Sequence, residues 1–396
     1  MSKKVIILLV ISGLFTLAMG LSNVFVNIFL WKKTNDFVLV AIYNLMHYIF
    51  APVSFILAGW LSKRKNGTWP LRIGISLFIL FFILILLFKH DVPNYASLFG
   101  ILFGLAAGFY WLAFHTLSFD FTSPSNRDTF NGLNGAIAGI SSAIAPFSAA
   151  FIIDRSEEFI GYSIIFGISL TLFCLLIIIS FFFTTEHYGD TLDFKKILSN
   201  DNKDWTHIRK SITLWGLRDV VILFLISILI FKTTNSILSL GKLSLFAHIL
   251  SSLAFVAEQK LIKPKRRWFS FHTGALFLLF SVLGLVFDIN MTFIIVFIVI
   301  DAISMPFFTV PVVSATFNII DQSKERSYRT EYIIRREINL CLGRVLSATT
   351  LILLLTFISN DRVLNYFLLF IGSAPVLALI FLRKLTIWDR TAKAQK

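Results

Sequence analysis

The sequence predicts an all-α polytopic membrane protein with twelve transmembrane helices arranged as two six-helix bundles. Its composition is the first reason: 57% of the 396 residues are hydrophobic and only 15% are charged, with 44 Phe and a mean hydropathy of +0.81. Soluble domains contain about 45–50% apolar and about 25% charged residues. One globular core cannot bury that excess of apolar side chains, so most of the chain is expected to lie in a lipid bilayer.

The second reason is the length of the apolar stretches, because a membrane-spanning helix needs about 20 apolar residues. The first stretch follows Lys3 and Lys4 and continues to Trp31, which is longer than the apolar part of a secretory signal, at about 7–15 residues, and predicts a retained span. The predicted spans cover residues 5–31, 38–61, 71–88, 95–118, 130–153, 160–183, 212–231, 237–261, 268–287, 291–314, 335–357 and 363–384.

The third reason is the distribution of positive charge. Most of the 36 Lys and Arg residues fall in alternate connections, beginning with the N-terminal segment. Since cytoplasmic loops are enriched in these residues, we expect both termini to be cytoplasmic, with the chain in the plasma membrane. The net charge of +14 follows from this topology and does not indicate nucleic-acid binding.

A polar stretch divides the apolar segments into two sets of six. We therefore expect an N-terminal bundle over residues 1–184, a cytoplasmic linker over 185–211 with a short surface helix near 193–199, and a C-terminal bundle over 212–396. The two halves resemble each other weakly, since a basic loop follows the second span of each one. Two related bundles are typical of transporters built from internal repeats.

Two sequence motifs resemble the major facilitator superfamily of secondary transporters. Residues 59–64, Gly59-Trp-Leu-Ser-Lys-Arg64, are similar to the family's loop after the second span, with Lys63 where an acidic residue is usual. The resemblance implies a gating loop containing Gly59 and Arg64, with Arg127 at the start of the fifth span. That span contains Gly135, Gly139, Ala143 and Pro146, similar to a motif associated with exporters.

Asp301 lies alone within an apolar stretch, about 15 Å into the tenth span at 1.5 Å per residue. A carboxylate at this depth costs roughly 3 kcal/mol or more, so it faces a partner, a cavity or a proton. Asp301 is followed by Pro306 and Pro311, which can kink the helix. A proton-coupling site and a structural ion pair are both compatible with this pattern.

Four other charged residues accompany it in the cytoplasmic half of the C-terminal bundle: Arg218, Asp219, Glu337 and Arg344. Glu337 and Arg344 are seven residues apart and therefore share a helix face. We expect Asp301 to bind and release the coupling proton, with Asp219, Glu337 and Arg344 tuning it. Arg344 is also the candidate to hold an anionic substrate group or to pair with Asp301. A gating network and a static network both remain open.

Polar residues also occur inside the N-terminal spans. They either bond between helices or line a substrate cavity, and the candidates are Asn23, Asn27, Asn44, His47, Tyr110, Trp111 and His115. In the fourth span, Gly100, Gly104 and Gly108 recur every four residues, which favours close helix packing.

No motif indicates an enzyme, a cofactor or a metal site, and the absence of an ATP-binding motif implies that an ion gradient supplies the energy. The function predicted from the sequence is proton-coupled efflux of a small, partly apolar solute by a monomer, with a cavity between the two bundles. Sodium coupling, a nutrient importer of the same fold, and a sensor or scaffold without turnover are alternatives.

Overall fold

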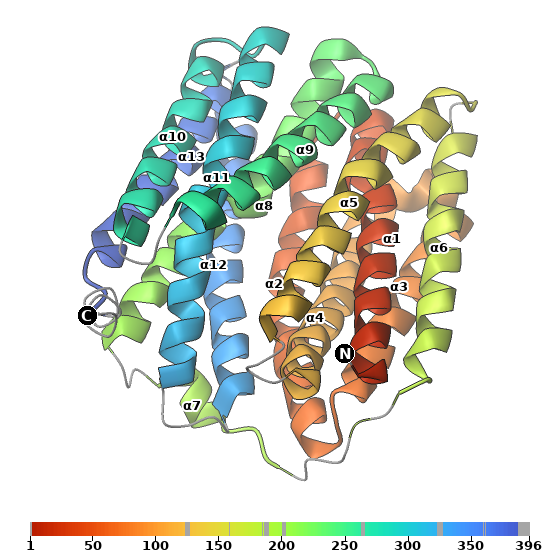
Figure 1. Ribbon diagram of the computed structural model, residues 1–396. Coiled ribbons are helices and arrows are strands. Elements are labelled where there is room, and N and C mark those ends of the chain that lie inside the picture. The colour runs from red at the N-terminus through yellow and green to blue at the C-terminus, as the bar shows by residue number, and fades with distance from the viewer. Residues whose placement is uncertain are drawn as a thin grey trace. The chain divides into compact units, whose positions relative to one another are not determined.

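The computed structural model describes residues 2–122, 127–157, 159–183, 185, 190–199, 203–262, 266–322, 328–358, 360 and 362–386, and all regular structure in these ranges is helical (Figure 1). The side chain of Arg127, the motif at 123–126 and the basic residues 263–265 lie outside the described residues. The predicted all-α fold class is confirmed.

Six long helices form the first half: α1 (Lys3–Thr34), α2 (Phe37–Arg64), α3 (Thr68–Phe88), α4 (Ala96–Phe121), α5 (Arg127–Asp154) and α6 (Ile160–Ser180), with a 3₁₀ helix η1 (Lys89–Tyr95) between α3 and α4. After the short α7 (Phe194–Leu198), six more follow: α8 (Lys203–Thr234), α9 (Ile237–Leu261), α10 (Arg267–Phe287), α11 (Met291–Gln322), α12 (Arg329–Phe357) and α13 (Val363–Leu382).

Eleven helical stretches among the described residues are long and apolar enough to cross a membrane. One of them, Thr68–Phe121, is 54 residues long and contains α3, η1 and α4. Because a span needs only about 20 residues, this stretch contains two spans, and the described chain holds the predicted twelve. The protein is a multi-pass membrane protein.

Several helices extend beyond the predicted spans, which corrects their boundaries. Helix α8 begins at Lys203 instead of 212, α12 begins at Arg329 instead of 335, and α11 ends at Gln322 instead of 314. Hydropathy detects the apolar part of a helix, whereas backbone hydrogen bonding continues through its polar ends. The short helix predicted near 193–199 is confirmed as α7.

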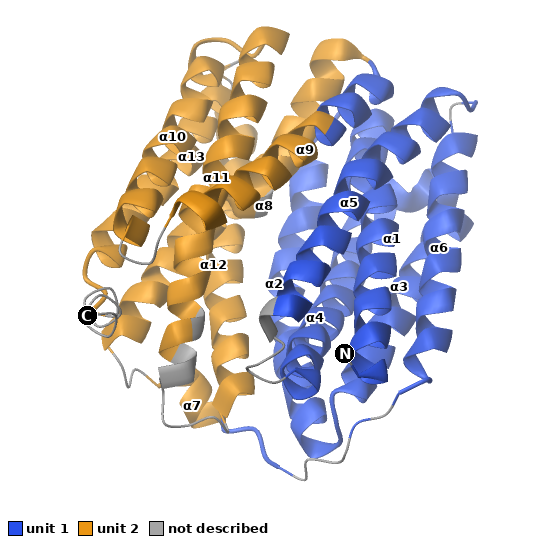
Figure 2. Ribbon diagram, viewed as in Figure 1, with its two compact units in different colours: residues 1–193, 236–245 blue, residues 194–235, 246–396 orange. Residues whose placement is uncertain are grey.

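The chain forms two compact units (Figure 2). Unit 1 comprises residues 1–193 and 236–245, and unit 2 comprises 194–235 and 246–396, so that α9 contributes to both. Unit 1 has an aromatic interior, in which Phe15 stacks on Tyr110 with ring centroids 3.5 Å apart and Phe78 stacks on Phe173 at 4.8 Å. In unit 2, Trp205, Phe271 and Phe308 are buried in the core.

The same structural details recur about 200 residues apart in the two units. Asn35 and Asn235, which follow α1 and α8, both have φ of 50°, in the left-handed region that asparagine tolerates better than most residues. A Cβ on Gly74 would lie 2.6 Å from the Tyr110 nitrogen, and one on Gly274 would lie 2.6 Å from the Phe308 nitrogen. The α3–α4 and α10–α11 contacts are therefore built in the same way.

The predicted close packing along the fourth span is confirmed. A Cβ on Gly100 would lie 2.2 Å from the Tyr43 carbonyl oxygen of α2, and one on Gly104 would lie 2.5 Å from that of His47. The fifth span differs at Gly135, where a Cβ would meet nothing within 4 Å.

We therefore expect Gly100→Ala to lower the free energy of unfolding by about 1–3 kcal/mol, because the new methyl group forces α2 and α4 apart. Gly135→Ala is the matched control, and we expect it to be neutral or stabilising by up to about 1 kcal/mol. Unfolding of the purified protein in detergent measures both. Equal destabilisation by the two substitutions would contradict this account of the α2–α4 contact.

Candidate functional site

Unit 2 contains a cluster of five charged side chains on α8, α11 and α12. Asp301 of α11 pairs with Arg218 of α8, and the same guanidinium lies within 3.5 Å of the Ser281 hydroxyl of α10, to which it donates. The Arg218 side chain is 2% exposed and that of Asp301 is 15% exposed. The Arg218–Asp301 pair therefore joins three helices in a largely water-excluded setting.

The second part of the cluster begins one residue later, at Asp219. Arg344 of α12 donates from Nε to Asp219 Oδ2 at 3.0 Å and also from Nη2 to the same oxygen. Its Nη1 lies 3.5 Å from Oε1 of Glu337 on the same helix. All three side chains are between 13% and 16% exposed. The shared face predicted for Glu337 and Arg344 is present.

The structure gives Asp301 a different partner from the one considered in the sequence. Asp301 pairs with Arg218, and Arg344 with Asp219 and Glu337. Successive residues on a helix point about 100° apart, since a turn takes 3.6 residues. Arg218 therefore reaches α10 and α11, while Asp219 reaches α12. The sequence placed Arg218 in the charged network but did not predict that it pairs with Asp301.

The five side chains together carry a formal charge of −1, because three carboxylates face two guanidinium groups. Asp301 has its own arginine, whereas Asp219 and Glu337 share one. Asp219 receives two hydrogen bonds from Arg344, and Glu337 makes a single, longer contact with it. Cys341 also lies 3.5 Å from Glu337 Oε1 and donates its thiol hydrogen to it. Glu337 is the carboxylate with the weakest ionic pairing.

Polar residues of unit 1 form an interhelical network. Asn44 of α2 donates from Nδ2 to Asn27 Oδ1 of α1 at 2.7 Å and to the Val40 carbonyl at 2.9 Å. Asn27 donates to the Asn23 carbonyl, and Tyr48 to Asn44 Oδ1 at 3.4 Å. Asn27 and Asn44 are each 5% exposed. Their amides bond α1 to α2 rather than facing open space.

We expect Asn44→Ala to lower the free energy of unfolding by about 0.5–2 kcal/mol, since interhelical hydrogen bonds in membranes contribute about 0.6 and at most about 1.7 kcal/mol. Asn94→Ala, an exposed change on η1, is expected to shift it by less than about 0.5 kcal/mol. Chemical unfolding in detergent compares the two. An Asn44→Ala variant with an unchanged free energy of unfolding would show that this hydrogen-bond network does not stabilise the protein.

The other N-terminal candidates differ in exposure. Tyr110 is 1% exposed and stacks within the core, while Trp111 is 39% exposed and Asn23 is also exposed. His115 stacks on Trp111 with centroids 5.9 Å apart, and His47 packs against Phe103 at 4.8 Å; both histidines are half-buried. Asn23 and Trp111 are thus exposed on α1 and α4, and His115 stacks beside Trp111.

The predicted gating residues Gly59 and Arg64, expected in a loop, lie instead in the last turns of α2, because the helix continues to Arg64. Gly59 is buried, and Arg64 is exposed with its guanidinium 5.2 Å from the Trp60 ring centroid. Lys63, which stands where an acid was expected, is 6% exposed, and its ammonium lies 3.5 Å from Asp190 Oδ2. The predicted linker therefore supplies a carboxylate to the C-terminal end of α2. Helix α5 begins at Arg127, whose side chain is not described.

The fold and these buried charges define a class: membrane transporters built from two related helical units. The chain belongs to the Major Facilitator Superfamily, whose model matches residues 8–382. The protein is accordingly a secondary transporter of small-molecule solutes, and it is not an enzyme.

Relatives of the chain are found among bacterial proteins. YqgE of Bacillus subtilis (strain 168), described as uncharacterised, is 34% identical over 392 residues, or 98% of this chain and 91% of YqgE. An uncharacterised protein encoded in the sodM 3′ region of Geobacillus stearothermophilus is 40% identical over 165 residues, or 42% of this chain and 77% of the relative.

Solved structures share the fold. The human organic anion transporter MFSD10 (TETRAN) superposes with a TM-score of 0.69 at 12% identity, covering 96% of this chain and 100% of the other. A variant of the nucleoside transporter NupG gives a TM-score of 0.69 at 11% identity, covering 96% and 99%. At these identities the likeness establishes the fold alone.

Proposed function

We propose that this secondary transporter couples export of a small, partly apolar solute to proton movement by alternating access. The transporter acts as a monomer in the plasma membrane. Both termini are cytoplasmic, as the distribution of Lys and Arg favours. The observation that carries the coupling proposal is the formal charge of −1 on the buried cluster of unit 2.

An uncompensated negative charge in a low-dielectric setting favours uptake of a cation, and a proton is the smallest available. Glu337 is the acceptor that the geometry supports best, because its single contact with Arg344 is the weakest in the cluster. Protonation of Glu337 would bring the five side chains to formal neutrality. Asp219 would then be the charged carboxylate of the cluster that pairs with Arg344. Asp219 tunes the site through this shared arginine.

Asp301 and Arg218 have a different part in this proposal. Each neutralises the other, and Ser281 accepts a further hydrogen bond from Arg218. This pair holds α8, α10 and α11 together while the neighbouring carboxylates exchange a proton. Asp301 thus supports the coupling site, and Glu337 carries the proton.

Asn23, Trp111 and His115 support the proposed solute site. Exposed polar atoms at membrane depth are costly against hydrocarbon and are tolerated along a polar pathway. The indole and imidazole rings offer stacking surface to an apolar part of the solute, and the Asn23 amide offers a hydrogen bond. Arg344 remains the candidate for an anionic group, which would compete with Glu337 for its guanidinium.

Transport of a labelled compound panel by purified protein in proteoliposomes tests this function. We expect at least one partly apolar compound to accumulate against its gradient when a pH gradient is imposed, and to equilibrate without one. Accumulation driven by a sodium gradient instead would overturn proton coupling. Binding of a compound without any movement would favour the sensor alternative over export.

A further inference from the structure

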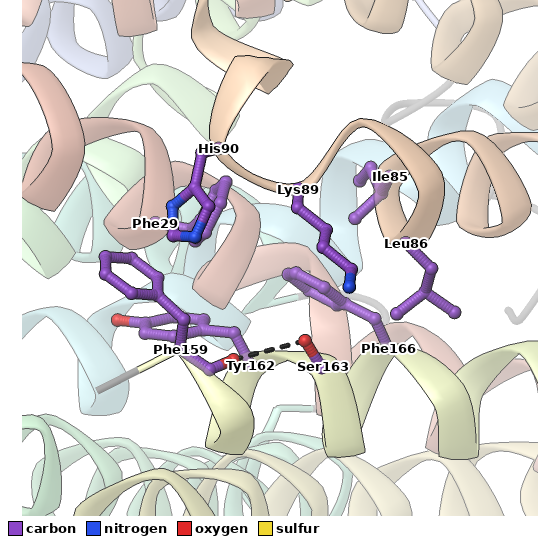
Figure 3. A pocket seen from close by; sticks show the side chains of 9 residues that line it. All are labelled: Phe29, Ile85, Leu86, Lys89, His90, Phe159, Tyr162, Ser163 and Phe166. Atoms are coloured by element: carbon purple, nitrogen blue, oxygen red, sulfur yellow. Dashed lines mark hydrogen bonds between the residues drawn. The ribbon is translucent and has the colours of Figure 1, made fainter. Parts of the chain in front are cut away.

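Unit 1 contains a second site, formed by residues other than those proposed for proton coupling in unit 2. A small pocket lies where α1, α3, η1 and α6 meet (Figure 3). Its base is apolar and includes Phe166 and Ile85, which are 2% and 3% exposed. Lys89 and His90 of η1 stand at its rim. The pocket is therefore amphipathic, with a cationic rim over an aromatic base.

Two contacts fix the arrangement of this rim. The Lys33 ammonium lies 2.6 Å from His90 Nδ1 and 3.5 Å from the Phe159 ring centroid. An ammonium can only donate, so Nδ1 of His90 accepts and its Nε2 carries the hydrogen. The cation–π contact holds Lys33 in place. Lys33 thereby adds a second positive charge directly behind the rim.

The Lys89 side chain is directed into the pocket, toward Phe166 and Leu86 (Figure 3). Lys89 has φ of 43°, and this left-handed turn ends α3 and begins η1. None of the nine residues lining the pocket is acidic, and no carboxylate of the described residues pairs with the Lys89 ammonium. The pocket thus offers positive charge without an internal counterion.

The surroundings of the pocket are suited to lipid chains. Leu87 beside it is 70% exposed, Ile160 is 52% exposed and Ile164 is 41% exposed, and all three belong to membrane-spanning helices. Aromatic and lysine side chains at the end of a span are typical of the level of lipid headgroups. A ligand with a phosphate at the rim and acyl chains along α3 and α6 would match both the cationic rim and the exposed apolar side chains beside it.

We propose that this pocket binds the headgroup of an anionic phospholipid, with Lys89 and the Nε2–H of His90 facing its phosphate and Lys33 adding positive charge behind His90. The hydrogen bond from the Ser163 hydroxyl to the Phe159 carbonyl orders the opposite wall (Figure 3). Bound lipid would fix the α3–η1 turn against α6. This site is independent of the proposed proton-coupling cluster.

Native mass spectrometry of the purified full chain tests the site, with phosphatidylglycerol or phosphatidylcholine of identical acyl chains added in neutral detergent. We expect preferential retention of phosphatidylglycerol, and roughly fivefold weaker retention in Lys89→Gln, from the usual effect of one lysine near anionic lipid. Lys242→Gln is the matched control, because Lys242 is an exposed lysine of the same unit outside the pocket.

Lys33→Gln, read in the same way, is a second variant that probes the rim without altering the α3–η1 turn. Unchanged phosphatidylglycerol retention in both pocket variants would overturn the proposal. An equal loss of phosphatidylglycerol retention in the control variant Lys242→Gln would also overturn it. A competition experiment with inorganic phosphate distinguishes a lipid headgroup from free phosphate as the bound anion. Displacement of phosphatidylglycerol by millimolar phosphate would assign the site to free phosphate and overturn the lipid assignment.

Discussion

Glu337→Gln is expected to reduce solute accumulation driven by a pH gradient by a large factor, while exchange of solute across the membrane continues. Glutamine is a neutral isostere of protonated glutamate. The variant therefore holds the cluster permanently at the formal charge that the cluster has when Glu337 is protonated. Coupling free energies of about 1–3 kcal/mol correspond to effects of about 5- to 150-fold, and we expect a loss within this range. Initial rates in proteoliposomes with and without an imposed pH gradient measure it.

The matched control for this variant is Glu157→Gln, since Glu157 is exposed in the connection between α5 and α6. The control should retain both coupled accumulation and exchange. Glu337→Gln protein that still accumulates solute at the wild-type level would remove Glu337 from the coupling mechanism. Loss of exchange as well as accumulation would indicate damage to the solute pathway instead.

Asp301→Asn is expected to have the largest effect on stability, lowering the free energy of unfolding by about 3–5 kcal/mol. The cause is Arg218, whose side chain is 2% exposed and whose guanidinium would be left buried without its carboxylate. Replacing both partners removes this penalty, so Arg218→Met combined with Asp301→Leu should recover most of the loss. Denaturant unfolding in detergent compares the single and double variants.

Asp288→Asn serves as the control, because Asp288 is an exposed aspartate just after α10, and its replacement should change stability by less than about 0.5 kcal/mol. A stable Asp301→Asn protein would contradict the structural role of the pair. If the double variant is stable but no longer couples transport to protons, Asp301 itself carries the proton and the assignment to Glu337 is wrong.

Composition and charge distribution were sufficient to predict the helical membrane fold, because insertion into a bilayer imposes length and charge rules on every span. Helix ends were less predictable, as α8 shows by beginning at Lys203 within a polar segment. Hydropathy reports where lipid contact begins, and the polar turns of a helix before that point carry no such signal.

Within the site, relations along one helix were predictable and relations between helices were not. Glu337 and Arg344 share a face because seven residues make nearly two turns. Whether Asp301 meets Arg218 or Arg344 depends on how α8 is rotated against its neighbours, which the sequence alone does not specify. The contact of Lys63 with Asp190 similarly joins residues from different parts of the chain, and no local pattern indicates it.

Tyr110 illustrates a further limit. Its aromatic ring, between Phe109 and Trp111 in the sequence, favoured a cavity-lining role, yet that ring stacks on Phe15 and the residue is 1% exposed. Adjacent residues on α4 point in different directions, so Trp111 is on the open face and Tyr110 is in the core. Without the packing of α1 against α4, the sequence does not distinguish these two environments.

The most direct test of proton-coupled transport is to measure proton movement caused by the solute itself. Wild-type protein is reconstituted into proteoliposomes containing a trapped pH-sensitive dye, and a solute gradient is applied without any initial pH gradient. We predict a change of internal pH whose sign reverses with the direction of the solute gradient and which is absent in Glu337→Gln vesicles. Solute flux through the wild-type protein with no accompanying change of internal pH would contradict the account.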